Sequence, residues 1–196
     1  MKKYLFAGDS ITNSGRFWED RTDGKDLGTG FVQMIYKMLK EKQDVDVINK
    51  GFDGYLSYEL ADIWQEICLN IKPDVLTILI GTNDIATAMY NKKKVMETRY
   101  GQSLEYMVSS AKESFNPQII LMTPIVDIKV GEYADWDDEI LEYISVVKDV
   151  SKKYGTEFVD IYSEIKTNNY TLDGIHPNMD GHKMIAEKWM EVYKRC

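Results

Sequence analysis

The chain has 196 residues, 44% of them apolar, which is enough for one hydrophobic core and one domain over residues 1–196. Its formal net charge is -8 and its pI is near 4.9, with lysines and arginines scattered among acids, so we expect neither a nucleic-acid nor an anionic-membrane partner. No apolar run reaches the roughly 20 residues of a membrane helix.

The apolar run after Met1 is too short for a signal peptide. The two cysteines, Cys68 and Cys196, suggest no disulfide framework. Together these features predict a cytoplasmic protein.

Short apolar runs alternate with longer segments of helical period, which predicts a parallel sheet covered on both faces. We expect strands at 3–7, 45–49, 75–80, 119–123 and 158–161, and helices at 30–42, 57–71, 97–115, 136–154 and 179–194. Ser57 is the expected N-cap of the second helix. Irregular stretches at 15–28 and 125–135 follow the carboxyl ends of strands, where open α/β sheets bind ligands.

Polar or glycine-containing segments follow the first three predicted strands. Gly8-Asp-Ser10 places a hydroxyl and a backbone N–H at the rim of the sheet, as a nucleophile and an oxyanion donor require, although the tripeptide alone favours a plain turn. The segment Asn49-Lys-Gly-Phe-Asp-Gly54 offers a glycine N–H, or a turn that closes a βα unit. Asn83 could aim its amide into the same space or bond only its own turn.

One of only two histidines ends the segment Asp173-Gly-Ile-His176 near the C-terminus. A serine, a histidine that deprotonates it and an aspartate that orients the histidine are the minimum set for nucleophilic acyl transfer. The three-residue offset on a shaped loop permits a buried Asp173–His176 dyad that faces Ser10, although a lone histidine before a proline is more often a surface or core histidine. His182, six positions further along a helix, is expected to face elsewhere and to bond loop backbone.

In this order the four segments resemble the SGNH or GDSL hydrolase superfamily, over nearly the whole chain. The resemblance implies a single-domain three-layer α/β/α sandwich with a flavodoxin-like, five-stranded parallel sheet. It also implies that Ser10 is the nucleophile, His176 the general base and then acid, and Asp173 its orienting partner. The oxyanion donors would be Ser10, Gly54 and Asn83, with Gly54 chosen over Gly51 because it matches the family spacing Asn-x-x-x-x-Gly.

Four further strings are similar to the bacterial acetylxylan esterase branch: Gly8–Arg16, Leu27–Phe31, Lys72–Leu76 and Leu121–Pro124. This likeness implies a small-molecule acyl ester substrate, an acetylated sugar such as a xylo-oligosaccharide, and is compatible with a homo-oligomer. The alternatives are an acyl thioesterase, a lysophospholipase-type lipase and a non-catalytic carbohydrate-binding relative.

Aromatic residues near the rim are candidates for stacking on a sugar ring, with core or interface packing as the alternative. They are Phe17, Trp18, Tyr55 and Trp136. Arg16 would position a substrate hydroxyl or brace the loop that follows it.

The remaining motifs predict neither a cofactor nor a metal. The chain has no His-x-x-x-His and no cysteine cluster, so no metal site is expected. Gly28-Thr-Gly30 follows a polar segment rather than a strand, which is the wrong context for a dinucleotide loop. Asp9 and Asp84 are expected to bond backbone N–H groups in turns rather than to act as a glycosidase pair.

Overall fold

Five parallel strands form one sheet in the computed structural model, which describes residues 1–17 and 22–194. The strands lie in the order β2-β1-β3-β4-β5. This is the doubly wound flavodoxin-like order, and it confirms the predicted sheet. The bounds are β1 Lys2–Gly8, β2 Val45–Gly51, β3 Val75–Leu79, β4 Gln118–Met122 and β5 Glu157–Val159.

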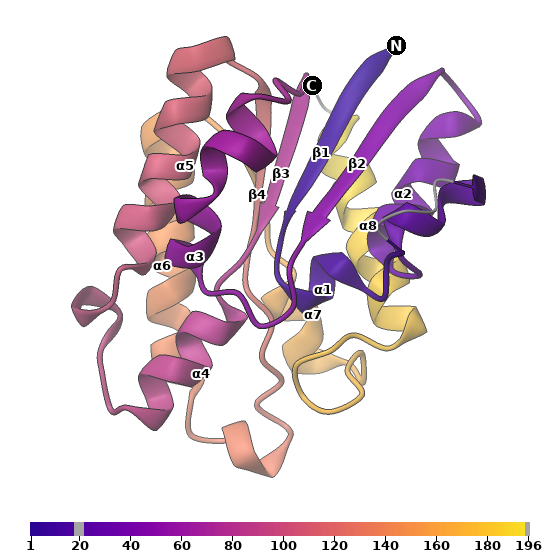
Figure 1. Cartoon of the computed structure of the whole chain (residues 1–196). Helices are drawn as coiled ribbons and strands as arrows, with labels where there is room; N and C mark the ends of the chain where they lie inside the picture. The colour runs from indigo at the N-terminus through magenta and orange to yellow at the C-terminus, as the bar shows by residue number, and fades with distance from the viewer. Residues whose placement is uncertain (18–21, 195–196) are drawn as a thin grey trace.

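Helices cover both faces of this sheet (Figure 1). Their bounds are α1 Ser10–Asn13, α2 Phe31–Lys40, α3 Ser57–Asp62, α4 Thr82–Tyr90, α5 Tyr100–Phe115, α6 Asp137–Tyr154, α7 Tyr162–Thr167 and α8 Met179–Tyr193. Short 3₁₀ turns span Thr22–Leu27, Val95–Glu97 and Gly131–Tyr133, and one π turn spans Gln65–Leu69.

The predicted helix at 57–71 is divided into α3 and the π turn. Ser57 is the first helical residue rather than the N-cap, which is Leu56, and the Leu56 N–H is bound by the Glu59 carboxylate at 2.9 Å. The Ser57 backbone N–H and hydroxyl both donate to Asp84, at 2.9 and 2.6 Å. The expectation of an N-cap at Ser57 was wrong, because the Ser57 hydroxyl binds a carboxylate distant in the sequence and not a backbone N–H of its own helix.

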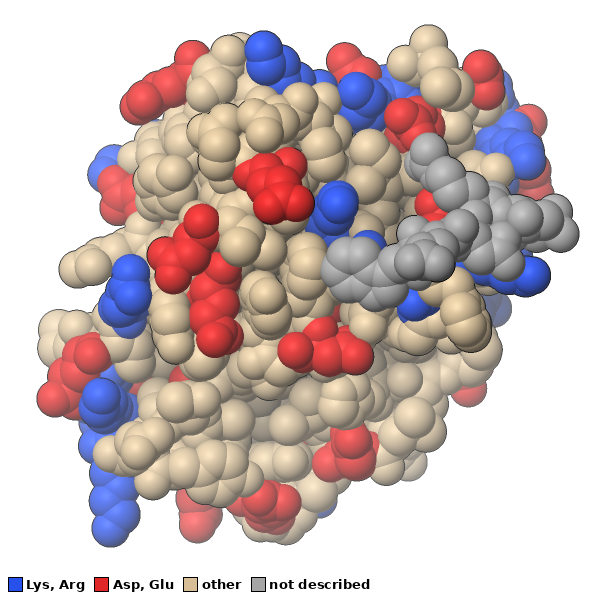
Figure 2. Space-filling model, in the orientation of Figure 1, with Lys and Arg blue, Asp and Glu red and all other residues tan. Residues whose placement is uncertain are grey.

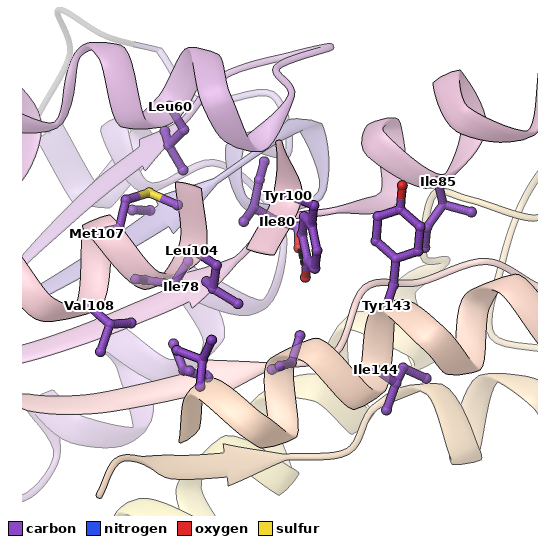
Figure 3. Close-up of a cluster of buried hydrophobic side chains, with 14 of the residues drawn as sticks. Leu60, Ile78, Ile80, Ile85, Tyr100, Leu104, Met107, Val108, Tyr143 and Ile144 are labelled. Carbon is purple, nitrogen blue, oxygen red and sulfur yellow. Dashed lines mark hydrogen bonds between the residues drawn. The ribbon is translucent and has the colours of Figure 1, made fainter. Parts of the chain in front are cut away.

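Side chains alternate between the two faces of the sheet, so each strand contributes to two cores. In β1, Leu5 and Ala7 pack under α3, α5 and α6, whereas Tyr4 and Phe6 pack under α2 and α8. Figure 3 shows part of the first core, where residues of β3 meet aliphatic and tyrosine side chains from α5 and α6. Burial on both faces explains why β1, β3 and β4 read as continuous apolar runs.

The carboxyl ends of β1, β2 and β3 lie level with one another. Gly8, at the end of β1, pairs with Gly51 of β2 on one side and Leu79 of β3 on the other. A Cβ at Gly8 would lie 2.1 Å from the Leu79 carbonyl oxygen, and one at Gly51 would lie 2.1 Å from the Asn13 nitrogen. Glycine is therefore required at Gly8 for the close approach of β1 to the end of β3, and at Gly51 for α1 to cross over the end of β2.

Surface charge of both signs is interspersed on the face shown in Figure 2. Within the described residues, no helix combines the length and the apolar character needed to cross a bilayer.

Candidate active site

Ser10 lies at the carboxyl edge of the sheet, as the first residue of the one-turn helix α1. Asp9 is the N-cap of this helix, and its Oδ1 accepts a hydrogen bond from the Ile11 N–H at 3.0 Å. The cap directs the partly exposed Ser10 side chain outward. Ser10 Oγ is 3.0 Å from His176 Nε2, so residues 166 positions apart meet at hydrogen-bond distance.

Asp173 orients His176 through three contacts. Asp173 Oδ2 is 2.7 Å from His176 Nδ1, and its Oδ1 accepts hydrogen bonds from the N–H groups of Ile175 and His176 at 2.9 and 2.8 Å. A carboxylate accepts only, so Nδ1 carries the hydrogen and the lone pair of Nε2 faces Ser10. This is the arrangement in which a neutral imidazole accepts the serine proton.

The electrostatics favour a charged Asp173. Partial burial raises the pKa of its carboxyl, but the hydrogen bonds from His176 and Ile175 outweigh burial and lower the pKa to about 2. The side chains of His176 and Asp173 are 47% and 56% exposed. The dyad is therefore not buried, because the loop that carries both residues lies at the surface.

Asp127 holds this loop in place from the segment after β4. The Asp127 N–H donates to the Gly174 carbonyl at 2.7 Å, and its Oδ2 accepts from the Thr171 hydroxyl at 3.0 Å. The Leu172 N–H also donates to the His176 carbonyl at 2.8 Å, which closes the loop on itself. Sequence reasoning missed Asp127, whose only signal was its place in the irregular stretch 125–135.

The two other predicted oxyanion donors follow β2 and β3. Gly54 is exposed, with a φ of +76° that favours glycine, and a Cβ added there would meet nothing within 4 Å. Asn83 lies in the first turn of α4, and its Nδ2 donates to the Tyr55 carbonyl at 3.0 Å. That bond uses one of the two amide hydrogens and fixes the side chain, so the second hydrogen can serve a ligand.

Arg16 braces the site from beneath. Its guanidinium, 8% exposed, donates to the carbonyls of Asn49 and Gly51 at 2.5 and 2.6 Å and to Asn13 Oδ1 at 3.0 Å. Burial lowers its pKa to about 10, still well above neutrality. Of the two predicted roles for Arg16, these contacts support the loop brace.

Asn49 completes the brace. Its side-chain amide donates to the carbonyls of Thr12 and Leu27 at 2.7 and 2.9 Å. The end of β2 is thereby tied both to α1 and to the loop that precedes α2. In the sequence, Asn49 stands out only as the first residue of the family spacing Asn-x-x-x-x-Gly, which does not reveal these contacts.

The predicted rim aromatics occupy different environments. Trp136 is 7% exposed and packs edge-on against Tyr90 and Tyr133, so its expected place on the rim was wrong and the packing alternative holds. Tyr55 is partly exposed and stacks on Phe52 with ring centroids 4.9 Å apart. Phe17 is 67% exposed, and Trp18 lies outside the described residues.

Asp9 and Asp84 are buried carboxyl groups that lie next in sequence to the predicted site residues Ser10 and Asn83. Burial raises the pKa of Asp9 to about 7, with a further contribution from the charge of Asp84, and burial also raises the pKa of Asp84 to about 6. Asp9 bonds a backbone N–H in its own turn, as predicted. Asp84 instead bonds Ser57, in the segment after β2, so it joins two of the loops that form the site.

His182 accepts a hydrogen bond from the Phe31 N–H on Nδ1 at 3.3 Å, which confirms the predicted bond to backbone. Burial lowers its pKa to about 4, so the imidazole is neutral near pH 7. It does not face away from the site, however, because it lines the same groove as His176. This groove, of about 310 Å³, opens beside Ser10 and His176.

A parallel sheet of this order, with a serine, a histidine and an aspartate joined at its carboxyl edge, is the framework of an acyl hydrolase. The chain belongs to the GDSL-like lipase/acylhydrolase family, which it matches over residues 6–184. It is accordingly a carboxylic ester hydrolase with the SGNH fold.

Solved and curated relatives agree with this assignment. Over 207 residues the chain is 30% identical to the acetylxylan esterase of Geobacillus stearothermophilus, and the match covers 96% of this chain and 92% of that protein. The crystal structure of Axe2, an acetylxylan esterase from the same species, superposes with a TM-score of 0.85 at 29% identity, covering 97% and 93% of the two chains. LAE5, an alpha/beta hydrolase from the metagenome of Lake Arreo, superposes with a TM-score of 0.86 over 98% and 95% of the chains, and at 24% identity this is a likeness of fold alone.

Proposed function

We propose that this protein hydrolyses acetyl esters of carbohydrates, with Ser10 as nucleophile, His176 as general base and then acid, and Asp173 as the group that orients the imidazole. The observation that carries the proposal is the continuous chain of contacts from Ser10 Oγ through both ring nitrogens of His176 to Asp173, at 3.0 and 2.7 Å. An acetylated xylo-oligosaccharide is the proposed natural substrate.

In the first step, Ser10 Oγ forms a bond to the ester carbonyl carbon while its proton passes to His176 Nε2. The carbonyl oxygen becomes an oxyanion, which the backbone N–H groups of Ser10 and Gly54 and the Asn83 amide stabilise. The bond to the alcohol oxygen then breaks, and that oxygen takes the proton from Nε2. Water, deprotonated by the same nitrogen, attacks the acyl-enzyme, releases acetate and restores the serine hydroxyl.

Two features of the relatives support this assignment. Mutants of Axe2 that are described as catalytic replace a serine, an aspartate and a histidine, and the aspartate precedes the histidine by three positions, as Asp173 precedes His176 here. A relative from Xylanibacter ruminicola is also named acetylxylan esterase. The chain is 30% identical to it over 169 residues, and the match covers 32% of that protein.

The test is the hydrolysis of p-nitrophenyl acetate by Ser10→Ala, with Ser109→Ala as the matched control. Ser109 lies on α5, and its hydroxyl donates to the Tyr106 carbonyl one turn back at 3.3 Å. We expect Ser10→Ala to lower kcat by about 10⁴ to 10⁶ if the three residues act as a unit, and the control to match the parent protein. Activity that persists in Ser10→Ala would refute the assignment of the nucleophile.

The acyl group is tested separately by a series of p-nitrophenyl esters from acetyl to octanoyl. A preference for acetyl is expected. A preference for octanoyl would remove the carbohydrate deacetylase proposal in favour of a lipase or thioesterase, and would leave the role of Ser10 intact.

A further inference from the structure

The groove beside Ser10 and His176 has two walls, which come from distant parts of the chain. Ser14 and Thr29, from the end of α1 and the segment before α2, form one wall, and Leu172 and Met179, which flank the histidine loop, form part of the other. In Figure 1 the loop before α8 lies beside α1 at the carboxyl edge of the sheet. Among the described residues that line the groove, none belongs to the segments after β2 and β3.

The direction of proton transfer decides which half of an ester lies on which side of Ser10. The histidine that deprotonates the serine must return the proton to the departing oxygen, so that oxygen lies within hydrogen-bond reach of His176 Nε2. The carbonyl oxygen must instead lie against the donors after β2 and β3. An ester placed in this way extends its alcohol half past His176.

We propose that this groove holds the alcohol half of the ester, a neutral polyhydroxylated ring such as a sugar, while the acyl group lies on the side of Gly54 and Asn83. The inference rests on the proposed function and adds to it the residues that select the alcohol. Those residues are Ser14, Leu172 and Met179.

The lining of the groove suits an uncharged ligand. Among its described lining residues there is no lysine, arginine, aspartate or glutamate, so nothing there would pair with a charged alcohol. Leu172 and Met179 are 76% and 62% exposed, and they offer an apolar surface to the face of a ring. A volume of about 310 Å³ is at the lower end of the range for small-molecule sites.

Ser14 supplies a hydrogen-bond donor to this groove. Because His182 Nδ1 accepts from the Phe31 N–H, the hydrogen of the neutral imidazole is on Nε2, which lies 3.4 Å from Ser14 Oγ. Ser14 Oγ therefore accepts from His182, and its own hydrogen remains for an oxygen of the ligand. Through this contact the neutral His182 orients the Ser14 hydroxyl toward the ligand, and it does so without contact with the reacting atoms.

The experiment fills the groove and then varies the two halves of the ester independently. Met179→Trp and, as a second variant, Leu172→Trp each add an indole to the wall, and Met96→Trp is the control. Met96 is 87% exposed on the 3₁₀ turn Val95–Glu97, outside the groove. The first substrate pair is methyl acetate and a monoacetylated methyl xyloside, which differ in the alcohol, and the second is methyl acetate and methyl butanoate, which differ in the acyl group.

We expect each groove variant to lower the ratio of kcat/KM for the acetylated xyloside over methyl acetate by about tenfold or more, the usual effect of misfit in a pocket. The acyl preference should stay as in the parent protein, and the control should change neither ratio. A shift in acyl preference with an unchanged alcohol ratio would assign the groove to the acyl group and overturn the inference. Unchanged ratios in both folded variants would also overturn it.

Failure of this inference is distinguishable from failure of the proposed function. Ser10→Ala is measured on the same substrates, and its loss of activity depends only on the nucleophile. If Ser10→Ala hydrolyses the esters as fast as the parent, the proposed function fails. If Ser10→Ala is inactive, but the groove variants keep the parent ratio of kcat/KM for the acetylated xyloside over methyl acetate, only the inference fails.

Discussion

Replacing Asp9 by Asn tests the consequence of burying a carboxyl group directly before the proposed nucleophile. Asp9 is 1% exposed, its Oδ1 accepts from the Ile11 N–H, and its Oδ2 has no protein hydrogen-bond partner within the described residues. Asn keeps an oxygen at the helix cap and is neutral at every pH. The substitution therefore removes the ionisation of residue 9 while it preserves the local hydrogen bond.

The sign of the effect follows from the number of protons that the folded protein and the unfolded chain each bind. Burial and the charge of Asp84 raise the pKa of Asp9 to about 7 in the folded protein, whereas its ordinary value is 3.8. Between these two pH values the folded protein binds more protons than the unfolded chain, so its stability falls as the pH rises. A difference of about three pH units, at 1.36 kcal/mol each, corresponds to at most about 4 kcal/mol.

The assay is urea unfolding of the parent protein and of Asp9→Asn between pH 4 and pH 8.5. We expect the free energy of unfolding of the variant to rise relative to the parent by up to about 4 kcal/mol across this range, mostly between pH 4 and 7. Asp62→Asn, at an exposed position in α3, should run parallel to the parent. If the curves for Asp9→Asn and the parent are also parallel, the carboxyl of Asp9 ionises alike in both states and the reasoning is refuted.

Two further predictions concern the oxyanion site and the second histidine. Asn83→Ala should lower kcat by about 10² to 10³, the usual loss for one oxyanion donor, and an unchanged kcat on p-nitrophenyl acetate would remove Asn83 from that role. Burial lowers the pKa of His182 from 6.5 to about 4. As the pH falls through this range, the unfolded chain binds the proton before the folded protein does, so the free energy of unfolding falls by up to about 3 kcal/mol. His182→Asn should remove that loss in the same unfolding series, and an equally steep decline in the variant would contradict it.

The three central strands β1, β3 and β4 could be predicted because they are buried on both faces. Each predicted strand coincides with an observed one to within two residues at either end. A continuous apolar run marks the central strands, and alternation of apolar and polar residues marks the edge strand β2. Helices α1, α4 and α7 were missed because segments of four to nine residues are too short to show a helical period. Tertiary contacts, rather than amphipathic pattern, determine these short helices.

The three residues proposed to react, Ser10, Asp173 and His176, lie together in the structure. They could be singled out in the sequence because each follows a strand or closes a loop in a recognisable short motif. The contacts that hold them could not be predicted, although a loop brace was one of the two roles expected for Arg16. Arg16, Asn49 and Asp127 act through hydrogen bonds to backbone carbonyls or loops distant in sequence, and such contacts have no spacing to detect. Trp136 was misplaced for a related reason, because an irregular segment before a helix resembles a rim loop until its neighbours Tyr90 and Tyr133 are known.

The tyrosine pair at the amino edge of the sheet has a practical consequence. The hydroxyls of Tyr4 and Tyr193 are 2.6 Å apart, so the beginning of β1 and the end of α8 meet on the side opposite Ser10. An affinity tag, a surface tether or a fusion partner attached at either position would leave the groove beside Ser10 and His176 facing solution. A short linker that joins these two ends would equally allow circular permutation, with new termini elsewhere in the fold.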